Sequence, residues 1–266
     1  MKWINKVRAR RHVRASSYRA ALEDLPDGLE TAWRHSAPQE YPGIRTDAFF
    51  FVRAAEGLLR FFDAVGRSER PCALPSEAAD AVWHAWLRHE SIGLERFCRK
   101  HFGRVIPHIE RGGLAPDALA NTLMTGRRLE GIAPLGPQLP PLFGLDARLR
   151  MPCGHGYWKR DGEIVYARLG KHGLCFGRAR PHPELGIPAL LAAGLVDADM
   201  VLAHMGLRPG AVGGSACGSF ADGPLDFVFA GDGDCTDNGG GSDGGGDGGG
   251  GSSCGSSCGG GCGGGD

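Results

Sequence analysis

The sequence predicts a mainly α fold: a helical globular domain with a small antiparallel β-meander and a disordered C-terminal tail. Three observations support this prediction. Apolar residues recur at helical spacing through most of residues 44–130. Short runs of strand-forming residues, separated by glycine-containing turns, follow within 131–180. From Gly231 onward glycine dominates and large apolar side chains are almost absent, so this part of the chain has nothing with which to build a core.

The composition divides the chain into three parts. Residues 1–43 are expected to form a basic amphipathic helix followed by a loop, residues 44–230 the globular body, and residues 231–266 a tail rich in glycine, serine, cysteine and aspartate. The body is expected to contain a helical stretch, an irregular stretch with the β-meander, and a stretch of short helices, which are residues 44–130, 131–180 and 181–208.

Five helices are expected before residue 131. Their predicted ranges or starting points are 2–23, 47–65, Ser76, 91–101 and Asp117. The helix at 47–65 is apolar around so much of its surface that it must be largely buried. Ser76 offers a hydroxyl to cap the third helix. Residues 25–42 are predicted to be a loop, because Pro-Asp-Gly at its start is a turn signal.

The spacing of apolar residues changes to that of strands after residue 156. Residues 157–160 and 163–166 form a predicted hairpin around Asp161-Gly162, a dipeptide typical of type I′ turns. A third strand is expected at 174–176. Two short helices follow, the second capped by Asp197, and their predicted ranges are 187–194 and 198–205.

Charge and cysteine content narrow the class of protein. The chain has 30 Lys and Arg against 30 Asp and Glu, but it is basic near its start and has no Lys or Arg after Arg208. The basic helix is either a solvated end or an arm for nucleic acid or a membrane surface, and the neutral balance favours the first. No secretory signal or transmembrane stretch is visible, and nine cysteines do not suggest a disulfide framework, so a cytoplasmic protein is expected.

The densest cluster of reactive side chains lies between Asp80 and His108. Asp80 and His84 are four residues apart on one predicted helix, and Cys98 and His101 are three apart on the next. If these helices form a hairpin, His84, Cys98, His101 and His108 converge as four candidate zinc ligands, with Asp80 behind His84 to orient its ring. The alternative is a structural role, in which Asp80 holds a half-buried His84 and Cys98 is a small core residue.

The same segment resembles a known family. The residues that carry the resemblance are Pro75-Ser76-Glu77-Ala78-Ala79-Asp80-Ala81-Val82-Trp83-His84, Phe97-Cys98, Phe102-Gly103 and His108. Over about residues 45–112 they resemble the glycine-rich domain-containing-protein-like family. The resemblance implies that its recurring positions here are Asp80, Trp83, His84, Cys98 and His108.

Two departures from that family's pattern concern the metal site. Trp86 stands where many members have a second histidine, and Ile109-Glu110 follows His108 where members have an acidic pair. Both changes weaken a metal site at these positions. The resemblance implies a module and no particular reaction.

The tail holds Cys254, Cys258 and Cys262 at intervals of four residues in a Gly/Ser setting. Three interpretations stay open: a linker with incidental cysteines, thiols that bind soft metals or take part in redox contacts, and a substrate for ring-forming peptide modification. The first is favoured, because the segment resembles a flexible linker in composition.

The expected function is that of a non-catalytic interaction or scaffold module with an unidentified protein partner. The alternatives are a metal-binding protein or metalloenzyme that uses the His/Cys cluster, and a precursor with a modified tail. No Walker loop or dinucleotide-binding motif is present, and Gly213–Cys217 lacks the second glycine of a hydrolase nucleophile elbow. The sequence therefore argues against an enzyme without excluding one, and it leaves zinc as the candidate cofactor.

Overall fold

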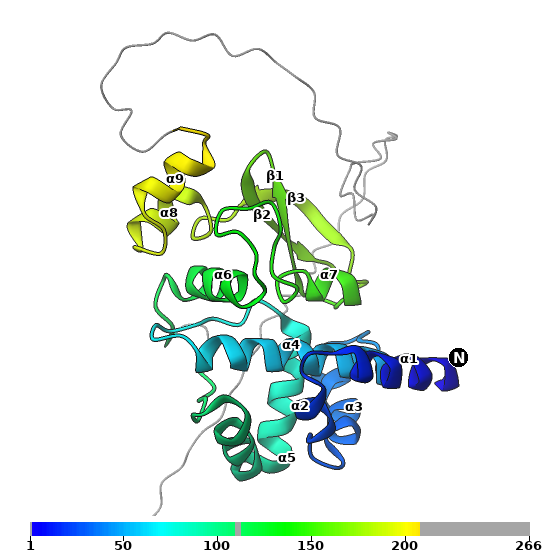
Figure 1. The fold of residues 1–266 in the computed structure, drawn as a ribbon. Helices are drawn as coiled ribbons and strands as arrows, with labels where there is room; N and C mark the ends of the chain where they lie inside the picture. Colours follow the sequence, from blue (N-terminus) through cyan, green and yellow to red (C-terminus); the bar gives the residue numbers. More distant parts are fainter. Residues whose placement is uncertain (1, 110–112, 208–266) are drawn as a thin grey trace, which may run out of the picture.

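Helix α4 (Ala48–Gly66) lies at the centre of a helical layer, and a small sheet lies beyond it (Figure 1). The computed structural model describes residues 2–109 and 113–207. The other helices are α1 (Lys2–Ala15), α2 (Arg19–Glu23), α3 (Leu29–Glu40), α5 (Glu77–Phe102), α6 (Ala118–Leu129), α7 (Leu145–Leu149), α8 (Ile187–Ala192) and α9 (Ala198–His204), and the strands are β1 (His155–Arg160), β2 (Glu163–Leu169) and β3 (Cys175–Pro181). The prediction of a mainly helical chain with a small antiparallel sheet is confirmed. The predicted disorder of residues 231–266 lies outside the described residues.

Helix α4 forms as the apolar pattern predicts and is the core of the helical layer. The carboxylate of Asp47 caps its start by accepting hydrogen bonds from the amides of Phe49 and Phe50, each at 3.1 Å. Phe50 and Phe62 are almost fully buried. They pack against aromatic rings from other helices, because a helix this apolar is stable only when covered on most sides.

The predicted loop at 25–42 is wrong, because residues 29–40 form α3. Leu29, Trp33 and Ala37 repeat every four residues and are fully buried. Trp33 stacks near Phe50 and Phe51, with ring centroids at 5.7 and 5.4 Å. The turn signal is correct, since Asp27 and Gly28 form a turn with Gly28 at φ 87°, but that turn only precedes α3, and burial of the apolar stripe after it stabilises a helix where a loop was predicted.

The predicted helix at 2–23 is broken into α1 and α2 at Ser16 and Ser17. The Ser16 hydroxyl donates to Glu56 on α4 at 2.7 Å and accepts the amide of Tyr18 at 3.1 Å. A serine that bonds to the local backbone competes with the helix, so the chain turns here and continues in a new direction. Leu22 of α2 then packs into the same core as α4.

Helix α5 spans the two helices predicted from Ser76 and at 91–101. Glu90, at φ −159° and ψ 82°, departs from helical geometry and bends the chain between them. The first half begins as predicted, with the Ser76 hydroxyl accepting the amide of Ala79 at 3.3 Å. The second half ends at Gly103, whose φ of 77° suits a glycine.

A buried carboxylate joins the start of α5 to the sheet. Asp146 of α7 accepts the Ser76 hydroxyl at 2.6 Å and the amides of Glu77 and Ala78, each at 3.0 Å. It also accepts the amide of His155 in β1 at 2.9 Å. These hydrogen bonds fix the first turn of α5, which includes Asp80 of the candidate site, against the sheet.

The sheet is an antiparallel meander in the order β1-β2-β3. Asp161 and Gly162 both have positive φ, 50° and 81°, as the predicted type I′ turn requires. Asp197 caps α9 as predicted, accepting the amide of Met200 at 2.7 Å. Across the described residues, no helix combines the length and apolar character that a membrane span needs.

Candidate metal centre

Three side chains converge beside the first half of α5. Asp80 and His84 lie one turn apart on that helix, and His108 lies on the segment that follows α5. His108 Nε2 is 3.2 Å from Asp80 Oδ1, and His84 Nε2 is 3.6 Å from Asp80 Oδ2. One ligand atom from each of the three lies within 4.8 Å of the other two. Among the described residues this is the group whose donor atoms are close enough to share one metal ion.

A second carboxylate orients His84 from behind. Glu40, at the end of α3, has Oε2 3.1 Å from His84 Nδ1 and Oε1 2.5 Å from an Arg88 nitrogen. When Nδ1 carries the proton and donates it to Glu40, Nε2 presents its lone pair to Asp80 and His108. This hydrogen bond raises the pKa of His84 above its usual value. Burial opposes ionisation of Glu40, but hydrogen bonds from His84 and Arg88 hold its pKa below its usual range.

The ring of His108 is held by aromatic contacts and by the chain before it. It packs edge-on against Trp83, with centroids 4.6 Å apart, and lies 4.9 Å from the His84 ring. Ile106, two residues earlier, is buried in the core. The Cys98 sulfur accepts a hydrogen bond from the Ile106 backbone. Cys98 therefore supports the segment that carries His108.

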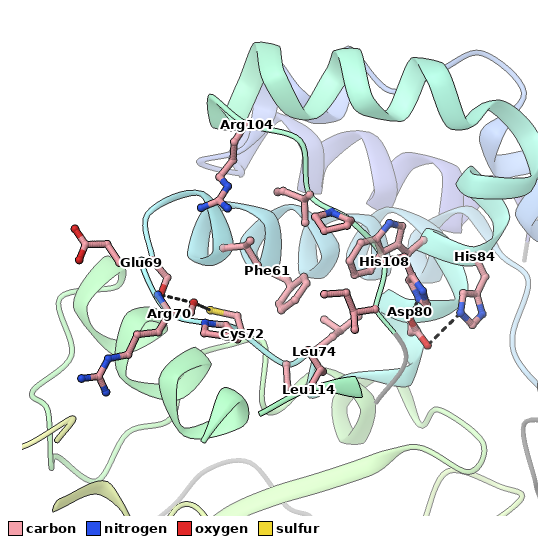
Figure 2. Close-up of a pocket in the computed structure, with 18 of the residues that line it drawn as sticks. Phe61, Glu69, Arg70, Cys72, Leu74, Asp80, His84, Arg104, His108 and Leu114 are labelled. Carbon is pink, nitrogen blue, oxygen red and sulfur yellow. Dashed lines mark hydrogen bonds and ion pairs between the residues drawn. The ribbon is translucent and has the colours of Figure 1, made fainter. Parts of the chain in front are cut away.

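The three side chains line a cavity of about 600 Å³. In Figure 2, His84, Asp80 and His108 lie at one side of it, Phe61 and Leu74 lie in the middle, and Arg104 lies farther along. The cavity is thus polar at the His84 end and apolar in the middle. A drug-sized molecule fits a space of this size.

Acidic groups outnumber permanent cations around the cluster. Burial is the main cause of the raised pKa of Tyr41, and the charges of Glu77, Asp80 and Glu40 raise it further. All three carboxylates are therefore close to the Tyr41 ring. The Tyr41 hydroxyl donates to Glu77 at 2.8 Å. Arg88 forms an ion pair with one of these carboxylates, that of Glu40. A surplus of negative charge in a partly buried site favours a bound cation.

The sequence-predicted ligand set is brought together only in part. Cys98 is fully buried, and burial raises the pKa of its thiol to about 12. His101 faces α2 and not the cluster: its Nε2 is 2.8 Å from Asp24, which follows α2, and its ring lies tilted against Phe97 with centroids 4.5 Å apart. Neither belongs to the converging group. Asp80 contacts both histidines directly, so its position is that of a metal ligand. The carboxylate that orients the His84 ring is Glu40 and not Asp80.

The sequence analysis missed Glu40 and Tyr41 because it placed them in a loop. Neither is close to His84 along the chain, so no local spacing links them. A test for an apolar repeat beginning at Leu29 would have found α3 and placed Glu40 on its last turn. The tail thiols Cys254, Cys258 and Cys262 lie outside the described residues.

The protein is thus mainly helical, and its candidate metal centre lies between α3, α5 and the segment after α5. A family model for the UCP032817-like family matches residues 29–172, more than half of the 266-residue chain. The chain belongs to this family. No curated protein matches the chain, and no solved structure does.

The match corrects the resemblance to the glycine-rich domain-containing-protein-like family, which is wrong. The matched region starts at α3, spans the segment that carried the resemblance, and continues into the sheet. The resemblance depended on a short pattern, a Trp-His helix with a downstream Cys and His. Several of its residues, Trp83, Phe97 and Cys98, belong to the buried core, so packing alone accounts for their residue types.

Proposed function

We propose that this protein binds a divalent transition-metal ion, with zinc as the favoured ion, through Asp80, His84 and His108. The observation that supports this most directly is the approach of one donor atom from each residue to within 4.8 Å of the others. Ligand atoms bound tetrahedrally at zinc distances are about 3.4 Å apart. The separations of 3.2 and 3.6 Å to the Asp80 oxygens are close to that spacing.

Three protein ligands and an adjoining cavity support a site of the catalytic kind. Structural zinc sites use four protein ligands, whereas catalytic sites keep one position for water or substrate. A zinc ion here would supply Lewis-acid activation of a bound water. The protein's own groups bind the ion, orient His84 through Glu40, and form the apolar middle of the cavity. We therefore favour the metal-binding alternative over a purely structural cluster.

The test is elemental analysis of the purified full chain. The four tail thiols are removed as competing ligands in every sample by replacing Cys235, Cys254, Cys258 and Cys262 with serine. In this background we expect about one equivalent of metal, and less than a tenth of that in His84→Ala or His108→Ala.

The matched control is His101→Ala, which removes a half-buried histidine of the same helix outside the cluster. It should keep the full metal content, and circular dichroism should show that all variants remain folded. Full metal content in a folded His108→Ala protein would refute the proposal. Equal loss in His101→Ala would instead point to the ligand set expected from sequence spacing.

An interaction module is the second candidate, because α1 exposes apolar side chains among its basic ones. Trp3, Ile4 and Val7 are 75%, 54% and 43% exposed. Such a surface suits a protein partner with an acidic, partly apolar face. A photo-crosslinker at position 3 should give one defined product in cells, lost in Ile4→Glu/Val7→Glu. No product, or one unchanged by that variant, would count against this role.

The cytoplasm is the compartment we propose. The buried, free thiols of Cys72 and Cys98 are compatible with a reducing environment. Measuring the protein's distribution in fractionated cells tests this directly, and enrichment in a secreted fraction would contradict it.

A further inference from the structure

A second cavity, of about 490 Å³, lies where the α1–α2 connection meets α4 and α7. It shares no lining residue with the cavity beside the candidate metal centre. Its charged and hydroxyl lining consists mainly of three guanidinium groups, one carboxylate and two hydroxyls: Arg53, Arg60, Arg148, Glu56, Ser16 and Ser17. Positive groups therefore outnumber negative ones here, in contrast to the first cavity.

The carboxylate of Glu56 is already satisfied. It is 2.6 Å from His12 Nε2, accepts the Ser16 hydroxyl at 2.7 Å and pairs with Arg60 at 3.1 Å. These partners hold the pKa of Glu56 below its usual range in spite of its burial. Arg60 also pairs with Glu130. Glu56 and Arg60 thus form a paired group, and the charge of Glu56 acts on Arg53 and Arg148 without forming an ion pair with either.

Arg53 and Arg148 have no carboxylate within ion-pair distance among residues 2–109 and 113–207. Arg53 lies over the ring of Phe49, 5.8 Å from its centroid, and Arg148 donates to the carbonyl of Pro141. Partial burial lowers the pKa of both arginines, and neighbouring guanidinium groups lower both further, Arg8 for Arg53 and Arg53 with Arg60 for Arg148, while Glu56 opposes this for each. Three guanidinium groups therefore line this cavity beside one carboxylate, and this excess of positive charge costs energy unless a bound anion offsets it.

We propose that this cavity binds the phosphate group of a small phosphorylated molecule, with Arg53 and Arg148 as its anchoring cations. A phosphate dianion neutralises both guanidinium groups, and each planar fork can donate two hydrogen bonds to its oxygens. The exposed Ser17 hydroxyl, which also lines the cavity, is a further donor. A bare phosphate occupies only a small part of 490 Å³, and the rest of the space accommodates the organic part of a phosphomonoester.

The experiment is isothermal titration of the full chain with inorganic phosphate, glycerol 3-phosphate and acetate. We expect both phosphates to bind and acetate not to bind. Tighter binding of glycerol 3-phosphate identifies a phosphorylated small molecule as the ligand class. Equal binding of the two shows that the phosphate group alone is recognised, and both results support the site.

The variants separate this site from others. Arg148→Ala should weaken phosphate binding roughly tenfold or more, and Arg148→Lys should weaken it less, because lysine keeps the charge but loses the fork. Arg148→Gln keeps a donor for Pro141 and guards against a folding defect in the alanine variant. Arg96→Ala, an exposed arginine on α5 outside this cavity, should leave binding unchanged. His84→Ala should also bind phosphate normally, which rules out the metal centre as the site.

Two results would overturn the inference. One is the absence of binding by either phosphate to the unmodified chain. The other is unchanged phosphate affinity in folded Arg148→Ala and Arg148→Gln proteins. Failure of the metal proposal does not affect this test, since the two cavities share no residue.

Discussion

Replacing Ser76 by alanine should destabilise the protein, and by more at alkaline than at acidic pH. The Ser76 hydroxyl accepts the amide of Ala79 at 3.3 Å and donates to buried Asp146 at 2.6 Å. Loss of a helix N-cap costs about 1 kcal/mol. Loss of a hydrogen bond to an ionised group costs about 1.5–3 kcal/mol. We therefore expect Ser76→Ala to lower the free energy of unfolding by about 2–4 kcal/mol at pH 8.

The pH dependence follows from the ionisation of Asp146. Burial raises its pKa to about 6, although hydrogen bonds from Ser76, the nearest amides and His155 oppose this. Because the folded pKa is above that of the unfolded chain, this carboxyl makes stability fall as the pH rises towards and through 6. Without the Ser76 donor the folded pKa is higher still and the fall is larger. Below about pH 5 the carboxyl is mostly protonated, so the penalty should shrink to about 1–2 kcal/mol.

The assay is urea unfolding followed by tryptophan fluorescence at pH 5 and pH 8, with the full chain. Ser17→Ala, which removes an exposed hydroxyl, is the control and should change stability by less than about 0.5 kcal/mol. A Ser76→Ala penalty that is the same at both pH values would refute the role given to ionised Asp146. A penalty below about 1 kcal/mol at pH 8 would refute the role of Ser76 as well.

Three further predictions concern the site and the core. Glu40→Gln should weaken metal binding about 10- to 100-fold without changing its stoichiometry, because the amide orients His84 less firmly; competition with a chromophoric chelator measures this, and unchanged affinity would argue against the contact. Metal occupancy should fall as the pH drops from 7 to 5, since the hydrogen bond from Glu40 raises the pKa of His84 and a protonated ring cannot bind metal; occupancy that is constant over this range would exclude histidine ligands. Trp33→Ala should lower the free energy of unfolding by about 3–5 kcal/mol, as deletion of a fully buried aromatic does, and Trp33→Phe by less; a near-neutral alanine variant in urea unfolding would show that α3 is not part of the core.

The candidate site shows where local spacing is informative and where it misleads. Asp80 and His84 are four apart on a helix, so their neighbourhood follows from the sequence alone. Cys98 and His101 are equally well spaced, yet one is enclosed in the core and the other contacts Asp24. Spacing tells which side chains share a helix face and not which way that face points, because the direction is set by packing against other helices.

The sequence analysis expected His108 near His84 as one outcome of a helix hairpin, and it did not predict the contact of His108 with Asp80. In the structure this contact depends on the chain after α5 returning along the helix, with Ile106 anchored in the core. Glu40 reaches His84 from a helix that the sequence analysis took for a loop. Both contacts join residues far apart in the chain, and no local preference encodes such pairs.

The sequence by itself determined the elements with strong local signals. The buried helix at 47–65, the N-caps at Ser76 and Asp197, and the Asp161-Gly162 hairpin are all confirmed, because hydrophobic period, capping and turn geometry act within a few residues. Only the tertiary structure decided that Glu90 bends α5 and which histidines meet at Asp80. These depend on how apolar faces from distant segments fit together in one close-packed core, and that fit is a property of the whole chain.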